Sequence, residues 1–372
     1  MSKIYRPLHI EVDLAALRKN AQKIKRFLGS KTKIIATVKQ SAYGHGLIPV
    51  TRELSREGID FFGVGSVEEA LSLRDEAIDA DILVLTAVMP EFVDCFIDHK
   101  ITPTVVAMRF AKELNKQANK RNLTMPIHVK IDTGMGRLGA YYKDAYKFIS
   151  EIKKLDNLLL EGLYTHFPVA DSDPEFTGYQ IDVFNKFIIR FKKENIRFKY
   201  HHCANSAAIT NYKNSHFNMA RPGLILYGVK PCRDINLNVE PVLSLKSKIV
   251  FIKRIEKGMS VSYGRTFIAK KPTRIATVSV GYADGYPWAL SNNAKVIIRG
   301  KVFKLAGRVC MDHIMVDIGD REDIKAGDEV ILIGKEASHK ISACDLASWA
   351  KTIPYEIVSR LSLKIPRIYT SF

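Results

Sequence analysis

Short apolar runs alternate with amphipathic stretches through roughly the first 230 residues of the chain. Between the runs, apolar residues recur at spacings of three and four, as in Leu14, Leu17, Ala21, Ile24 and Leu28, which indicates helices with one buried face. Alternating strands and helices are typical of an α/β protein with a parallel sheet, and eight such units predict a closed (β/α)8 barrel of the TIM type. The predicted strands are Ile34–Lys39, Phe61–Ser66, Asp81–Thr86, Ile101–Val106, Ile127–Thr133, Leu158–His166, Phe198–Asn205 and Leu224–Gly228.

The pattern changes near residues 234–240. Beyond that point strands and turns follow one another, with glycine at most junctions. We therefore predict two domains, a barrel at residues 1–235 and a mostly-β domain at residues 236–372 that is closed by a short helix near Ala343–Ala350. The predicted strands of the second domain are Val242–Ile255, Arg274–Val280, Lys295–Ile298, Val302–Leu305, His313–Ile318 and Glu329–Ile333.

The composition fits a globular protein of two domains. Its 372 residues, 47% hydrophobic and 26% charged, can bury a large core. The first residues lack the apolar core of a signal peptide, and no run reaches the ~18 apolar residues of a membrane span, so we expect a cytoplasmic protein with no membrane partner. The cysteines include no Cys-x-x-Cys pair, so we expect reduced thiols and no metal site. They are Cys95, Cys203, Cys232, Cys310 and Cys344.

The net charge of +18 raises the question of nucleic acid, because a basic surface attracts any polyanion. The positive charge is nevertheless spread along the chain in short pieces, such as residues 23–26 and 192–193, each beside apolar helix positions. This arrangement is more typical of solvated helix faces than of a nucleic-acid site. We therefore expect no nucleic-acid partner.

Lys39 is the first candidate for chemistry. It ends the apolar run Ala36-Thr37-Val38 and is followed by a turn that contains Gly44 and Gly46. A lysine at the carboxyl end of the first barrel strand would lie where barrel active sites lie, and burial would lower its pKa toward that of a free amine able to form a Schiff base. The alternative is a lysine that merely reaches solvent from a strand end.

A second candidate runs from His128 to Gly139, in the order HVKIDTGMGRLG. Strand alternation places His128, Lys130 and Asp132 on one face of the predicted strand. Charged side chains rarely point into a barrel unless they are paired. A surface strand edge followed by a flexible glycine turn is the alternative, and it fits a central parallel strand poorly.

Two further stretches could hold a phosphate. Asn205-Ser206 and Arg221-Pro222-Gly223-Leu224 lie near the last predicted strands, where barrels of this type bind phosphate through backbone N–H groups. An ordinary helix N-cap at Asn205-Ser206 is the alternative. His166 ends the sixth predicted strand, where a lone histidine is more often a satisfied core residue than a catalyst.

Taken together, these stretches resemble the alanine racemase family, which has a barrel and uses pyridoxal 5′-phosphate (PLP). Residues 38–46 are similar to its cofactor-lysine motif, although most members have Ala-Asn where this chain has Gln40-Ser41, and residues 132–137 match its Asp-Thr-Gly-Met-Gly-Arg motif. The resemblance implies that PLP is attached to Lys39. It further implies that the phosphate is held by Tyr43, Ser206, Gly223 and Leu224. His166 would contact the cofactor ring, and Arg221 would face the ring nitrogen. Arg137 would contact the cofactor and the substrate carboxylate, and Lys130 would be carbamylated.

The second domain extends the resemblance. The stretches around Tyr263, Tyr282 and Met311-Asp312 are by themselves typical of glycine-punctuated hairpins with packed aromatics, but they match motifs of the family closely. The match implies that Tyr263 is a catalytic base delivered to the partner subunit, that Met311 and Asp312 line the partner's substrate site, and that the protein is a homodimer with shared active sites. Tyr355 resembles a late tyrosine of the family that contacts the phosphate.

The activity implied is the interconversion of L-alanine and D-alanine by two bases, with Lys39 serving the D-face and Tyr263 the L-face, to supply D-alanine for peptidoglycan. A tyrosine with an ordinary pKa of ~10 needs neighbouring cations to act as a base, for which His166 and Arg221 are candidates.

Arg221 bears most directly on the reaction type. Because the pKa of arginine lies above ~12, it cannot give the ring nitrogen a full proton, which weakens the ring as an electron sink. Related decarboxylases on this fold have an acid there instead, so Arg221 favours a racemase. Three alternatives remain: a racemase of the same family for serine or basic amino acids, a PLP-dependent decarboxylase, and a basic nucleic-acid-binding protein.

Overall fold

The computed structural model describes residues 5–230 and 237–371. It divides into two compact units. We call the first, Leu17–Ala42 with Leu47–Val239, the barrel unit, and the second, Met1–Ala16 with Tyr43–Gly46 and Glu240–Phe372, the β unit. The predicted domain boundary at residues 235 and 236 lies outside the described residues, as does Cys232.

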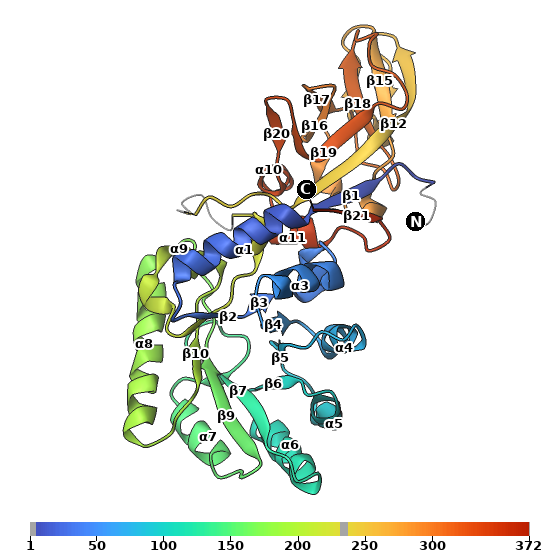
Figure 1. The fold of residues 1–372 in the computed structure, drawn as a ribbon. Coiled ribbons are helices and arrows are strands. Elements are labelled where there is room, and N and C mark those ends of the chain that lie inside the picture. Colours follow the sequence, from blue (N-terminus) through green and yellow to red (C-terminus); the bar gives the residue numbers. More distant parts are fainter. Residues whose placement is uncertain (1–4, 231–236, 372) are drawn as a thin grey trace. The chain divides into compact units, whose positions relative to one another are not determined.

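Parallel strands form the wall of the barrel unit (Figure 1). In its described part they follow the order β3 (Ala36–Thr37), β4 (Phe61–Val64), β5 (Asp81–Val84), β6 (Thr102–Val105), β7 (Met125–Asp132), β9 (Leu158–Tyr164) and β10 (Tyr200–His202). The short strand β11 (Met219–Ala220) pairs in parallel with β2 (Lys33–Ile34), and the Arg221 N–H donates to the carbonyl of Ala204 just beyond β10. These bonds join the two ends of the path, and the predicted barrel class is confirmed.

Helices connect successive strands and lie on their outer side (Figure 1). Local sequence explains where they begin: Ser66 accepts a hydrogen bond from the Glu69 N–H at the start of α4, and Asp173 does the same for Phe176 at the start of α8, where Pro174 occupies the first turn. The helices are α1 (Leu14–Leu28), α2 (Lys39–Tyr43), α3 (Leu47–Arg56), α4 (Val67–Asp75), α5 (Val93–Asp98), α6 (Met108–Lys120), α7 (Ala145–Ile152), α8 (Pro174–Lys193) and α9 (Ser206–Asn211).

The eighth barrel strand differs from the prediction. We expected it at Leu224–Gly228, but these residues form the 3-10 helix η3 (Leu224–Tyr227), which ends at Gly228 with φ of 69°, and the strand is β11 instead. All residues of η3 are fully buried. A short run that is apolar throughout has no period that separates a buried strand from a buried helical turn, which explains the error.

The β unit contains an antiparallel sheet with one parallel pair. Its described residues give the strand order β20-β19-β16-β17-β18-β15-β12-β1-β21. All the strands predicted for the second domain are present, but the sequence analysis missed three strands of this sheet, β1, β20 and β21. Strands β1 and β21 pair with each other in parallel, and β1 also pairs with β12. The bounds are β1 (His9–Asp13), β12 (Leu243–Ile255), β15 (Thr273–Val278), β16 (Lys295–Ile298), β17 (Lys301–Leu305), β18 (Ile314–Gly319), β19 (Glu329–Glu336), β20 (His339–Ile341), β21 (Arg367–Thr370) and the helices α10 (Ala343–Ala350) and α11 (Pro354–Ser359).

In the part of the chain that the structure describes, every helix is too short or too polar to cross a membrane.

Gly162 on β9 predicts a cost for a single added methyl group. A Cβ at this position would lie 2.4–2.5 Å from ring atoms of His128, which is fully buried on β7. Gly162→Ala should therefore destabilise the protein by about 1–3 kcal/mol through overpacking, seen as a lower midpoint of thermal unfolding. Gly178→Ala on α8 is the matched control, because a Cβ there would meet nothing within 4 Å. Equal midpoints for the two variants would contradict the packing of His128 against β9.

Candidate active site

Lys39 lies at the end of the first barrel strand and is half-buried. The Val38 N–H donates to the carbonyl of Gly63, which continues the pairing with β4, and the chain then enters the turn of α2. Burial lowers the pKa of Lys39; Arg137 and Arg221 lower it further, while Glu69 opposes them. The amine is therefore more readily deprotonated than that of an exposed lysine, as Schiff-base chemistry requires.

Lys130 on β7 is buried, with Nζ 5.4 Å from the centre of the Tyr164 ring. Burial, followed by the positive charges of Arg221 and Arg137, lowers its pKa to about 7. A substantial fraction of this amine is thus neutral near physiological pH.

Arg221 is a buried cation of the site, at 5% exposure. Its terminal nitrogen Nη1 donates to Nδ1 and to the carbonyl of His202, at 2.6 and 2.9 Å, and Nη2 donates to the carbonyls of Thr165 and Cys203, at 2.7 and 3.1 Å. Because these bonds all use the two terminal nitrogens, the Nε–H is the donor that remains for a ligand. Carbonyls satisfy the guanidinium without neutralising its charge.

Arg221 also fixes the tautomers of two buried histidines. Arginine can only donate, so Nδ1 of His202 accepts and its hydrogen lies on Nε2. That nitrogen is 2.8 Å from Nδ1 of His128, which accepts in turn and carries its own hydrogen on Nε2, 3.4 Å from Glu161 Oε2. Burial lowers the pKa of both histidines, which keeps them neutral. The chain of donors therefore runs in one direction, from Arg221 through His202 to His128, and the Glu161 carboxylate lies 3.4 Å beyond it.

His166 follows β9, with Nδ1 3.3 Å from Nη2 of Arg221. Burial first, and then the positive charges of Arg221 and Lys130, holds the pKa of His166 well below its usual range. His166 is therefore neutral, and because Nδ1 accepts from arginine its hydrogen lies on Nε2.

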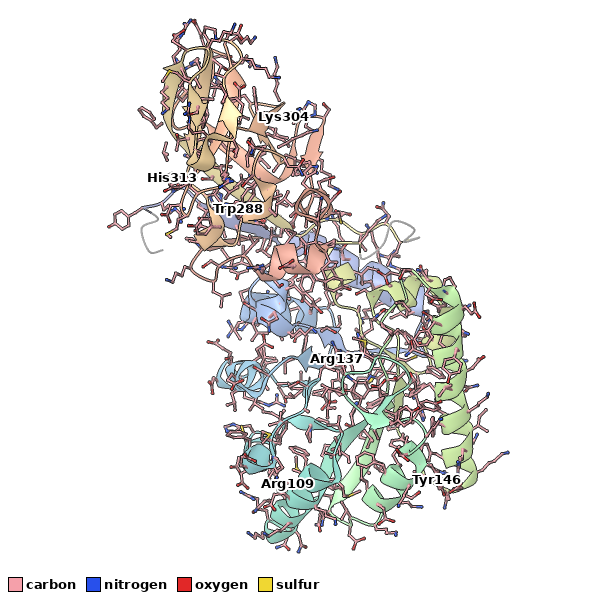
Figure 2. All side chains as sticks on the ribbon, turned by 180° about the vertical axis from the view of Figure 1, so that it is seen from behind. Arg109, Arg137, Tyr146, Trp288, Lys304 and His313 are labelled. Carbon is pink, nitrogen blue, oxygen red and sulfur yellow. The ribbon has the colours of Figure 1, made fainter. Side chains whose placement is uncertain are left out.

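Arg137 lies in the loop after β7 (Figure 2). Asp132, at the end of the strand, organises this loop: Oδ1 accepts from the N–H groups of Gly134 and Met135, and Oδ2 accepts from that of Arg137. The sequence analysis had placed Asp132 on the inward face with His128 and Lys130. Its carboxylate instead serves the backbone that carries Arg137.

Ser206 and Gly223 meet as the phosphate hypothesis requires. Ser206 is buried at the start of α9, where the side chain of Asn205 caps the helix by accepting from the Ala208 N–H. The Ser206 hydroxyl oxygen accepts from the N–H of Gly223 at 3.0 Å and from that of Ile225 at 3.4 Å. Because the oxygen is the acceptor in these bonds, the hydroxyl hydrogen stays free to donate.

The β unit carries the remaining candidates. Tyr43 and Tyr355 lie beside each other, with ring centres 6.1 Å apart. Tyr263, Met311 and Asp312 are exposed, Tyr263 at 70%.

Tyr263 stands on unusual backbone. The residue before it, Ser262, has φ of 65° and ψ of −179°, a conformation rare outside glycine. The Ser262 hydroxyl donates to the carbonyl of Arg308 at 2.7 Å. A Cβ on Gly264, the residue after Tyr263, would lie 2.9 Å from the Arg308 guanidinium carbon, so Arg308 packs closely against the turn.

The sequence analysis missed two residues of the barrel site, Glu69 and Glu161. It also missed that His202 accepts a hydrogen bond from Arg221. The strand register could have indicated His202, because it is paired with Tyr164, which is itself paired with Lys130. Among residues 5–230 and 237–371, no group of three His, Cys, Asp or Glu residues could hold a metal ion.

Comparisons with known proteins agree with this geometry. The family model for the alanine racemase N-terminal domain matches residues 12–231, and that for the C-terminal domain matches residues 242–369. The chain belongs to the alanine racemase family. The alanine racemase of Halothermothrix orenii is 42% identical over 99% of this chain and 98% of its own.

Solved alanine racemases have the same fold. The structure from Clostridium difficile 630 has a TM-score of 0.92 at 38% identity and covers 99% of this chain and 97% of its own. The structure from Bacillus anthracis with bound L-Ala-P has a TM-score of 0.92 at 34% identity and covers 99% and 96%.

Lys130 predicts a pH dependence of stability. Its pKa is 10.5 in an unfolded chain and about 7 in the folded protein, so between these values the unfolded state binds more protons and the free energy of unfolding rises with pH, by up to ~1.4 kcal/mol per unit. Lys130→Met removes this contribution. In CO₂-free buffer, we expect the midpoint of thermal unfolding of the variant, minus that of wild type, to be highest near pH 7 and to fall as the pH rises. A constant difference over that range would contradict the lowered pKa.

Proposed function

We propose that this protein interconverts L-alanine and D-alanine with PLP as its cofactor. The observation that carries the proposal is the half-buried Lys39 amine, whose pKa is lowered by burial and by Arg137 and Arg221. Membership in the alanine racemase family over nearly the whole chain supports the substrate. In a bacterium, D-alanine from this reaction would supply peptidoglycan.

The barrel residues fit this cofactor. Arg221 can only donate, and its Nε–H suits a ring nitrogen that accepts. The free hydrogen of the Ser206 hydroxyl suits a phosphate oxygen, with Gly223 and Leu224 beside it. Tyr43 and Tyr355 would add their phenol groups to the phosphate site. When bound, the cofactor withdraws electrons from the substrate and so acidifies its α-hydrogen.

The residues of the chain then divide the work. Lys39 Nζ exchanges a proton with the α-carbon on the D-face, and the Tyr263 oxygen does so on the L-face. Arg137 binds the substrate carboxylate, and neutral His166 contacts the ring. Arg221 would face the ring nitrogen and, because its pKa lies above ~12, would not give that nitrogen a full proton, which favours racemisation over other reactions.

Lys130 is the proposed site of carbamylation. The neutral amine is the form that reacts with CO₂, and a pKa of about 7 makes that form abundant. The product carries a negative charge in place of a positive one. That anion would orient the Arg137 guanidinium.

We further propose a homodimer in which Tyr263, Met311 and Asp312 of each subunit complete the site on the partner's barrel. Tyr263 is 70% exposed and Met311 is 53% exposed. This exposure supports the role, because large side chains exposed together often mark a surface that another protein chain covers. We also propose two domains along the chain, residues 1–235 and 236–372, with residues 5–16 and 43–46 packed in the compact unit of the second.

Lys39→Ala tests the cofactor assignment. We expect wild-type protein reconstituted with PLP to show the visible absorbance of bound cofactor and to form D-alanine from L-alanine. Lys39→Ala should lose that absorbance and at least ~10³-fold in rate, because the attaching amine and one base are gone. Lys112→Ala, which removes an exposed lysine of α6, is the control and should match wild type. A wild-type protein that does not load PLP would refute the proposal. Comparing L-alanine with L-serine and L-lysine under the same conditions defines the substrate range.

Mixing two inactive variants tests the shared site. If Tyr263 serves the partner's barrel, a dimer of one Lys39→Ala and one Tyr263→Ala subunit holds one site with both native residues, so equilibrated equal mixtures should recover roughly a quarter of wild-type activity. If Tyr263 served its own barrel, every site in the mixture would lack one base. No recovery, with subunit exchange verified by differently tagged subunits, would therefore refute the shared site.

A further inference from the structure

The turn after Lys39 has backbone that needs support. Gln40, Ser41 and Ala42 have φ of 54°, 52° and 53°, and Tyr43 continues them with 53°. In the left-handed region Cβ approaches the following carbonyl oxygen, so residues other than glycine rarely adopt it in succession. Such a turn persists only where neighbouring groups hold it.

Glu69 on α4 is one of these groups. Its Oε1 accepts from the Ser41 N–H at 3.0 Å, and its Oε2 accepts from the Gly65 N–H at 2.8 Å. Its own N–H donates to the hydroxyl of Ser66, the N-cap of α4. One carboxylate therefore joins the turn after Lys39 to the end of β4 and the start of α4.

The stem of Lys39 rests on the same strand end. A Cβ at Gly65 would lie 3.2 Å from Cβ of Lys39 and 3.4 Å from Oε2 of Glu69. Gly65 thus leaves free a space that the lysine stem and the carboxylate both border. A shift of Gly65 or of Ser41 would move the lysine.

We propose that Glu69 is a positioning residue that aims the Lys39 amine by holding the left-handed turn behind it against β4. This inference rests on the proposed function, which gives the aim of Lys39 its purpose. Glu69 is also the negative charge that opposes Arg137 and Arg221 in their effect on the pKa of Lys39.

An acidic residue in the first turn of a helix also stabilises the helix by its charge. Glu68 precedes Glu69, is exposed, and interacts with Ser66 in the same first turn. Glu68→Gln therefore removes the helix contribution without touching Ser41 or Gly65, and it is the matched control for Glu69→Gln.

Two measurements test the proposal on the full chain. The first is hydrogen–deuterium exchange of the segment from Val38 to Tyr43, with and without PLP. The second is the rate at which cofactor-free protein takes up PLP as a function of pH. For Glu69→Gln we expect faster exchange in this segment and a maximal rate of PLP uptake lower by about 10- to 100-fold, because the turn is no longer held. The pH at which the uptake rate is half-maximal should fall, because a charge that raises the pKa of Lys39 is lost. Glu68→Gln should match wild type in all three.

The outcomes separate the two proposals. If wild type loads PLP and Lys39→Ala does not, yet Glu69→Gln exchanges and loads like wild type, the positioning role is refuted while the proposed function stands. Equal changes in Glu68→Gln and Glu69→Gln would also refute it, because they would reflect helix stability alone. If wild type itself does not load PLP, both proposals fail. Should Glu69→Gln not fold, Gly65→Ala provides the second variant: it keeps the carboxylate but crowds the lysine stem, and a wild-type uptake rate there would overturn the proposal.

Discussion

The buried guanidinium of Arg221 is the constraint on which the barrel site depends. A cation at 5% exposure must be met by acceptors, and backbone carbonyls at the ends of two strands supply them. Because carbonyls carry no net charge, the positive charge persists inside the barrel. After burial, it is among the causes that lower the pKa values of Lys39, Lys130 and His166. One fixed charge thereby adds to the effect of burial on groups that lie on or just after three other strands.

Much of this fold could be predicted from local patterns, because the spacing of apolar residues differs between buried strands and helices with one buried face. The failures occurred where local pattern carries no information. The run at 224–227 is apolar throughout, so its period is invisible, and it became a 3-10 helix. Strand β1 was missed because the partners that make it a strand, β12 and β21, lie more than 230 residues away along the chain.

The candidate site shows the same division. Lys39, Arg137 and Arg221 stand in stretches that resemble family motifs, so sequence alone singled them out. The residues that control them did not stand out, because their partners come from other elements. Glu69 meets Ser41 across 28 residues, and His202 meets Arg221 across 19. Such pairings follow from strand order and register, which a single sequence leaves open.

Both proposed bases stand beside backbone that residues with side chains rarely adopt. Lys39 precedes a run of left-handed residues, and Tyr263 follows Ser262, whose φ is 65°. Each such residue costs about 1–3 kcal/mol, so each turn needs a bond that offsets the strain. In the barrel unit that bond is the Ser41 N–H donated to Glu69, and in the β unit it is the Ser262 hydroxyl donated to the Arg308 carbonyl. Both bonds act on the backbone next to the base, so they direct the side chain while leaving its reactive nitrogen or oxygen free for the substrate.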